Sequence, residues 1–72
     1  MDIRRHVGLN VRRLREERGW SQEELGFECK RDRTYISGIE RGIRNPTVVV
    51  VQEIANALKV PAAKLLEVQP RR

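Results

Sequence analysis

The sequence predicts an all-α fold in which five short helices form a single domain. Arg, Glu, Leu and Ala are abundant and only three residues are proline, a composition that favours helices. Apolar residues recur at helical spacing along most of the chain. A chain of 72 residues has room for one small core and not for two. We therefore expect one helical domain over residues 1–68 and a disordered tail at residues 69–72.

An apolar stripe and a capping signal mark the first two helices. The stripe predicts a helix over residues 2–18, because its members recur at i, i+4, i+8 and i+11: Ile3, Val7, Val11 and Leu14. The second helix begins at Ser21, whose hydroxyl can cap the first turn while Glu24 caps it in return. Gly26 lies inside this helix, where glycine costs about 1 kcal/mol against alanine. We explain it by a close approach of the third helix.

The third helix is predicted by residues 32–43, DRTYISGIERGI. Asp32 is a good N-cap, and Gly42 suits the left-handed position that ends a helix. Its inner stripe is expected to be Ile36, Ile39 and Ile43. The opposite face is short-chained in its middle and basic at both ends, and consists of Arg33, Thr34, Ser37, Gly38 and Arg41. A short helix with two caps and a donor-rich outer face suits the major groove of DNA.

The last two helices follow a turn that contains Pro46, which disfavours helix at the residue before it. Thr47 caps a fourth helix that runs to about residue 59. Its inward residues are expected to be Val48, Val51, Ile54, Ala55 and Leu58. Pro61 ends this segment and begins a short fifth helix over residues 62–67.

The composition favours a polyanionic partner, because the chain carries a formal net charge of +5. Cys29 is the only cysteine, so no intrachain disulfide or cysteine-rich metal site can form, and a reducing cytoplasm is the expected location. One histidine, one cysteine and mostly surface acids make no catalytic triad, metal-ligand cluster or phosphate loop. We expect no enzyme activity and no cofactor. No apolar run is long enough to span a membrane, and no small-molecule ligand is indicated.

Helix, tight turn and helix over residues 21–41 form a helix-turn-helix, in which one helix lies on the DNA backbone and the next enters the groove. SQEEL at 21–25, YISGIERG at 35–42 and RNPT at 44–47 resemble the Cro and phage-repressor helix-turn-helix family, the XRE family. The resemblance covers about residues 7–66 and implies a lambda-repressor-like five-helix domain. The run DRTYISGIER most resembles the controller proteins of restriction–modification systems, which are small dimeric regulators.

The turn departs from the pattern of this family. The family usually has glycine and then a small apolar residue there, whereas this chain has Lys30 and Arg31. A left-handed residue other than glycine costs about 1 kcal/mol. The two added charges favour a phosphate, so Arg31 is a candidate phosphate contact.

Base contacts are expected from the outer face of the third helix. Arg33 and Thr34 lie at its N-terminal end, from which side chains reach base edges. Arg33 can form the bidentate contact with guanine that is the commonest specific pairing; the alternative is a solvated surface arginine. Tyr35 packs on a sugar-phosphate or a thymine methyl, or it covers the turn. Ser37 is a further candidate.

Phosphate contacts are expected from the start of the second helix and from the loop after the third. Gln22 lies where backbone N–H groups and the helix dipole favour an anion, and the resemblance assigns the matching glutamine a phosphate contact. Arg44 and Asn45 resemble the second phosphate clamp of the family, with a solvated loop as the alternative. Arg41 is a further candidate at the end of the third helix.

Glu40 lies one step from the inner stripe of the third helix, where an unpaired carboxylate is costly. It needs a cation, and the resemblance supplies Arg15 from the first helix. We expect these two residues to form a structural ion pair.

A homodimer is expected, because one small module makes few base contacts and two half-sites on a palindromic operator supply useful specificity. The interface is expected on the fifth helix and the outer face of the fourth, at an apolar patch of Val49, Val50, Leu65 and Val68; scattered surface valines are the alternative. The sequence thus predicts a regulator of transcription that binds double-stranded DNA, either a repressor or a restriction–modification controller. Two alternatives are an antitoxin whose main partner is a toxin protein, and non-specific binding of RNA or DNA.

Overall fold

The computed structural model describes residues 2–68, and this range contains five helices. They are α1 (Ile3–Glu17), α2 (Gln22–Cys29), α3 (Arg33–Glu40), α4 (Val48–Leu58) and α5 (Ala62–Leu65). The predicted all-α fold and the order of its helices are confirmed. Helix α5 is shorter than predicted, because it ends at Leu65 and not at residue 67. The tail predicted at residues 69–72 lies outside the described residues.

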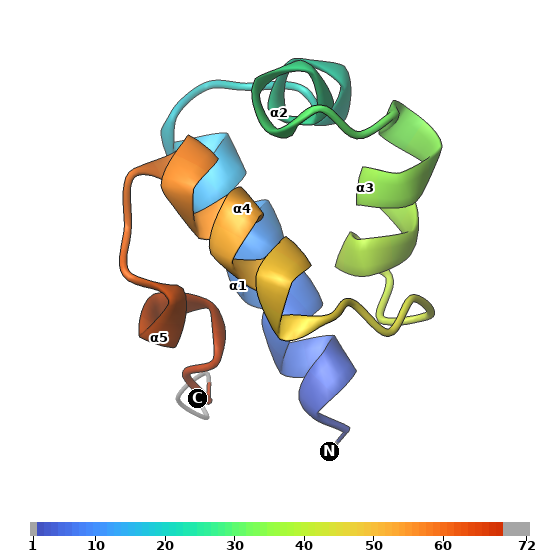
Figure 1. The fold of residues 1–72 in the computed structure, drawn as a ribbon, viewed down its shortest axis with the longest axis vertical. Coiled ribbons are helices and arrows are strands. Elements are labelled where there is room, and N and C mark those ends of the chain that lie inside the picture. The colour runs from blue at the N-terminus through green and yellow to red at the C-terminus, as the bar shows by residue number, and fades with distance from the viewer. Residues whose placement is uncertain (1, 69–72) are drawn as a thin grey trace.

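The five helices surround one core. In Figure 1, α1 and α4 occupy the centre, α2 and α3 form the top and the right-hand side, and α5 lies at the lower left. Helix α1 contacts α3, α4 and α5, so it supports both α3 and the C-terminal part of the domain. Trp20 packs against the core from the turn after α1. The core consists of Val7, Val11, Leu14, Leu25, Cys29, Ile36, Ile39, Val50, Val51, Ile54, Ala55, Leu58 and Leu65.

The predicted helix caps are confirmed. In α2, the backbone N–H of Glu24 donates to Oγ of Ser21 at 3.0 Å, and the N–H of Ser21 donates to Oε1 of Glu24 at 2.7 Å. The Asp32 carboxylate accepts from the backbone of α3, and the Thr47 hydroxyl accepts from that of α4. These bonds satisfy N–H groups that have no partner inside their own helices, so the helix starts follow from local sequence.

Two glycines allow close contacts to α3 and to the turn before it. A Cβ atom at Gly8 of α1 would overlap the carbonyl oxygen of Ile39 and would lie 2.6 Å from that of Glu40. A Cβ atom at Gly26 would overlap the carbonyl oxygen of Arg31. The close neighbour of Gly26 is therefore the turn and not the third helix itself, which corrects our expectation.

The turn between α2 and α3 uses the backbone conformation that the sequence led us to expect. Lys30 ends α2 with φ 61° and ψ 40°, in the left-handed region. The left-handed conformation is strained for a residue with a side chain. Gly42 adopts φ 76° after α3, where its missing side chain makes this conformation cheap.

Three expected core residues are exposed. Ile43 lies beyond the last residue of α3 and is 63% exposed, because Gly42 turns the chain away before the stripe can continue. Ile3 and Val48 are the first residues of α1 and α4. Each helix begins beyond the edge of the core, so these two side chains are exposed although they continue the apolar stripe. No helix in residues 2–68 has the length and apolarity needed to cross a lipid bilayer.

Candidate nucleic-acid interface

The two faces of α3 differ in chemistry. Ile36 and Ile39 are buried in the core, and they fix the helix against α1 and α2. Arg33 and Thr34, in the first turn, are exposed, and Ser37 is partly exposed. A rigid apolar face thus holds a guanidinium and hydroxyl groups toward solvent, the donors and acceptors that can pair with base edges.

A loop arginine lies across the middle of α3. A Cβ atom at Gly38 would lie 2.6 Å from Cγ of Arg44 and 3.2 Å from its Nε, so the glycine leaves the space that Arg44 occupies. The Arg44 guanidinium lies over the Tyr35 ring, 4.9 Å from the ring centre, a distance at which the ring attracts a cation. Arg44 therefore adds a positive charge to the surface of α3 although it belongs to the following loop. Arg41 and Asn45, beside it in the chain, are exposed.

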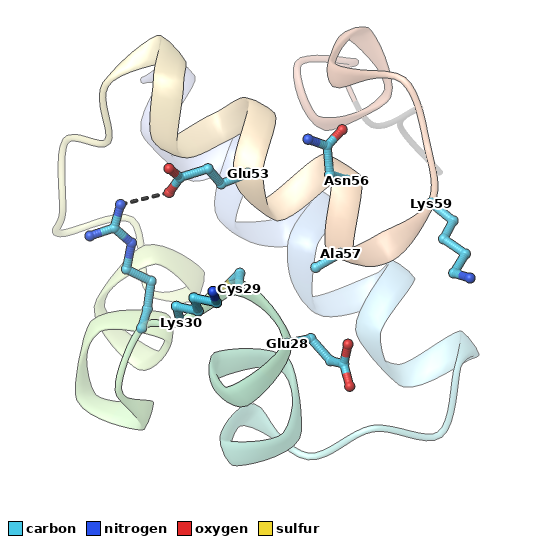
Figure 2. A pocket seen from close by; sticks show the side chains of 8 residues that line it. Glu28, Cys29, Lys30, Glu53, Asn56, Ala57 and Lys59 are labelled. Atoms are coloured by element: carbon cyan, nitrogen blue, oxygen red, sulfur yellow. Dashed lines mark hydrogen bonds and ion pairs between the residues drawn. The ribbon is translucent and has the colours of Figure 1, made fainter.

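Arg31, in the turn before α3, is bound to α4. Its Nη2 donates to Oε1 of Glu53 at 2.6 Å, the interaction drawn as a dashed line in Figure 2. This hydrogen bond raises the pKa of the Arg31 guanidinium. The same guanidinium lies 5.6 Å from the centre of the Tyr35 ring. The sequence placed Arg31 in the turn but named no partner for it, because Glu53 is 22 positions away and no local pattern joins them.

The Arg31–Glu53 pair borders a cleft of about 540 Å³ between the end of α2 and α4. In Figure 2, Glu53, Asn56 and Ala57 line it from α4, and Glu28 and Cys29 line it from α2. Burial raises the pKa of the Cys29 thiol, so this thiol is a poor nucleophile at neutral pH. Because the walls carry both signs of charge, the cleft has no preference for a polyanion.

A buried ionic cluster joins the start of α2 to the end of α3. Nε of Arg15 donates to Oε2 of Glu40 at 2.6 Å, and Nη2 donates to Oε1 at 3.0 Å. The ion pair expected for Arg15 and Glu40 is therefore confirmed. Gln22 Nε2 also donates to Oε1 of Glu40 at 3.0 Å, a contact that no local sequence pattern predicts. The side chain proposed for a phosphate is thus oriented by the Glu40 carboxylate.

The apolar patch expected at the dimer interface is only partly exposed. Val50 is 8% exposed and Leu65 is fully buried, so their assignment to a surface patch was wrong. Val50, Ile54 and Leu58 recur at i, i+4 and i+8 and therefore lie on the core side of α4. Val49 and Val68 are exposed.

Residues 11–65 match the helix-turn-helix family HTH_3. The chain belongs to this family. The matched segment includes α2, the turn and α3, and it also includes the Arg15–Glu40 pair and the Arg44 loop.

Several similar proteins are named as transcriptional regulators or controller proteins. An uncharacterized HTH-type transcriptional regulator, y4dJ of Sinorhizobium fredii, is 46% identical over 66 residues, which are 92% of this chain and 86% of the relative. The control protein C.BamHI of Bacillus amyloliquefaciens is 45% identical over 92% of this chain and 83% of its own length. A solved structure of the restriction–modification controller protein C.Esp1396I, a tetramer in complex with its natural 35 base-pair operator, superposes with a TM-score of 0.81. It is 35% identical, and the match covers 90% of this chain and 86% of that chain.

Proposed function

We propose that this protein is a sequence-specific regulator of transcription that binds double-stranded DNA through α3. The observation that carries the proposal is the arrangement of α3 itself. Its apolar face is fixed in the core, whereas Arg33, Thr34 and Ser37 face solvent. A helix held in this way by a helix-turn-helix lies in the major groove with its N-terminal residues at base edges. The net charge of +5 supplies the attraction to phosphates.

The proposal gives separate roles to the residues of the interface. Arg33, Thr34, Tyr35 and Ser37 face the bases, and Arg33 pairs with guanine. Phosphates are bound by the residues that flank this surface: Gln22, Arg41, Arg44 and Asn45. Gln22 keeps a second N–H on Nε2 after donating to Glu40, and this N–H is available for a phosphate.

The functional unit in this proposal is a homodimer on a palindromic operator in the cytoplasm. Two symmetry-related copies of α3 then read half-sites about 34 Å apart. The exposed apolar residues nearest the C-terminal end of the described chain, Leu66 and Val68, are suited to the interface. The likeness to C.BamHI and C.Esp1396I supports the role of a restriction–modification controller, and a restriction endonuclease gene beside the gene for this chain is the observation that tests it. The relatives reported above give no support to an antitoxin.

The test of the proposal is selection of bound sequences from random duplex DNA, followed by competition. The selected sequence is expected to bind at least about 10³-fold more tightly than random duplex at the same salt concentration. It is also expected to contain an inverted repeat. Equal affinity for selected and random DNA would show non-specific binding of polyanions instead.

A further inference from the structure

Arg31 differs from the exposed arginines of the candidate interface because an acid within the same chain neutralises it. Arg33, Arg41 and Arg44 form no ion pair among the described residues, whereas Arg31 pairs with Glu53. The pair joins the turn before α3 to α4, and its side chains remain 35% and 43% exposed. Both side chains are therefore accessible to solvent.

The paired position leaves part of the Arg31 guanidinium unsatisfied. Nη2 donates to Glu53, but Nε is buried and has no hydrogen-bond partner among the described residues. A buried donor without a partner is unfavourable. Once the guanidinium leaves Glu53 and Nε is exposed, a phosphate can accept from Nε and from an Nη group together, which is the geometry that arginine favours. Exchange of the carboxylate for a phosphate is therefore chemically reasonable.

Arg31 also lies beside the N-terminal end of α3, which faces DNA in the proposed function. It precedes Arg33, the proposed guanine contact, by two positions, and its guanidinium lies over Tyr35. A free arginine at this place is a contact with the DNA backbone, which adds affinity for any sequence. The contact with Glu53 competes with that use of the side chain.

We propose that Glu53 withholds Arg31 from DNA, so that the Arg31–Glu53 ion pair limits the sequence-independent part of the affinity. The proposal rests on the proposed function, because it requires that α3 faces DNA. In the free protein the carboxylate holds the guanidinium against α4. On DNA, a phosphate must displace this carboxylate before Arg31 contributes. Base preference is not altered, because it depends on residues of α3 that Glu53 does not contact.

The experiment measures binding of the full chain to a fluorescent random-sequence duplex at several salt concentrations. Glu53→Gln is expected to bind more tightly and to depend more steeply on salt. Each additional phosphate contact makes the slope of log K against log salt concentration, where K is the association constant, more negative by about 0.9. At about 0.1 M salt this corresponds to an affinity about eightfold higher per protomer. The selected operator is expected to gain the same factor.

Two variants separate this effect from a change in net charge. Glu17→Gln also removes one negative charge and also releases an arginine, since Glu17 pairs with Arg13 at 3.1 Å within α1, and neither residue is among those proposed to bind DNA. It is expected to gain much less affinity than Glu53→Gln. Adding Arg31→Gln to Glu53→Gln is expected to abolish the gain in affinity. In the wild-type background, Arg31→Gln is expected to lower the affinity less than it does in the Glu53→Gln background.

Three results would overturn the proposal. The first is a gain no larger than that of Glu17→Gln, and the second is a gain that persists without Arg31. The third is weaker binding by a Glu53→Gln variant that melts like the wild type, because Glu53 would then position the turn for binding. Failure of the proposed function is distinguishable from all three, since the wild type itself would then bind the selected operator no more tightly than random duplex.

Discussion

The Arg15 guanidinium and the Glu40 carboxylate meet between α1 and α3 through two hydrogen bonds, of 2.6 Å and 3.0 Å. Their side chains are only 11% and 3% exposed. Nη1 of Arg15 also donates to the carbonyl oxygen of Trp20 at 2.7 Å. The pair therefore fixes the end of α3 to α1 and to the turn that precedes α2, and it helps to set the orientation of α3 within the domain.

Glu40→Ala is expected to destabilise the protein by about 3 kcal/mol or more, because it leaves the Arg15 charge buried without a partner. Urea denaturation followed by circular dichroism measures the change. Glu17→Ala is the matched control: it removes an exposed i, i+4 pair, which is worth only about 0.3–0.5 kcal/mol. A Glu40→Ala variant as stable as the control would show that the pair contributes little.

Two glycine-to-alanine substitutions are expected to have opposite effects on stability. At Gly8 the new methyl group meets carbonyl oxygens of Ile39 and Glu40, which can yield only if α1 and α3 separate, so the overpacking cost of about 1–3 kcal/mol exceeds the helix gain. At Gly38 it comes within 2.6 Å of Cγ of Arg44, which moves only by a rotamer change that gives up the contact with the Tyr35 ring. The gain of about 1 kcal/mol of helix propensity from alanine offsets that loss. The melting temperature should therefore fall for Gly8→Ala, whereas for Gly38→Ala it should stay the same or rise. An undiminished melting temperature for Gly8→Ala would contradict the close contact of the two helices.

The sequence predicted the features of this fold that depend on neighbours in the chain. Ser21, Asp32 and Thr47 act as caps, because a cap bonds to a backbone N–H only two or three residues away. The inner residues Ile36 and Ile39 of α3 were likewise found from helical spacing. The outer face of α3, and with it the candidate site, followed from the same spacing.

Features that depend on contacts between distant segments were not predictable in this way. Val50 was placed on the wrong face of α4, because four successive valines at 48–51 give no contrast from which to choose the face. The partner of Arg31 is on another helix, and so is the carboxylate that orients Gln22. Arg15 was assigned to Glu40 only through the family resemblance, since Glu40 showed the need for a cation but not its source.

The buried thiol of Cys29 is expected to make stability depend on pH above neutrality. Burial raises its pKa, so the folded protein binds the thiol proton more tightly than the unfolded chain does. This contribution is fully present below the pKa of the unfolded thiol, and it is lost as the pH rises toward the higher pKa of the folded state. Urea midpoints at increasing pH should therefore fall more steeply for the wild type than for Cys29→Ala. Equal slopes for the two proteins would exclude the thiol as the cause.

Val68→Glu is expected to weaken the proposed dimer. A carboxylate without a partner in an apolar interface costs more than about 1.4 kcal/mol, or about tenfold in the dissociation constant. Sedimentation at several concentrations measures the constant. Phe27→Glu is the matched control, because Phe27 is 82% exposed on α2, at the end of the molecule away from α5 in Figure 1. Equal dimer fractions in the two variants would place the interface elsewhere.

Arg33 and Arg44 are expected to make different kinds of contact with DNA. Arg33 projects from the first turn of α3, whereas Arg44 belongs to the following loop and its side chain lies over Gly38 and Tyr35. Arg33→Ala is expected to cost about 1–3 kcal/mol per half-site on the selected operator and to flatten the preference at one base pair. Arg44→Ala is expected to weaken operator and random duplex alike, and to make the salt dependence shallower by about 0.9 per half-site. Titrations of both variants on both DNAs at several salt concentrations measure these changes. If Arg33→Ala lowers both affinities equally and keeps the base preference, Arg33 binds only phosphate, and the residue that reads a base would then have to be sought at Thr34, Tyr35 or Ser37 on the same helix.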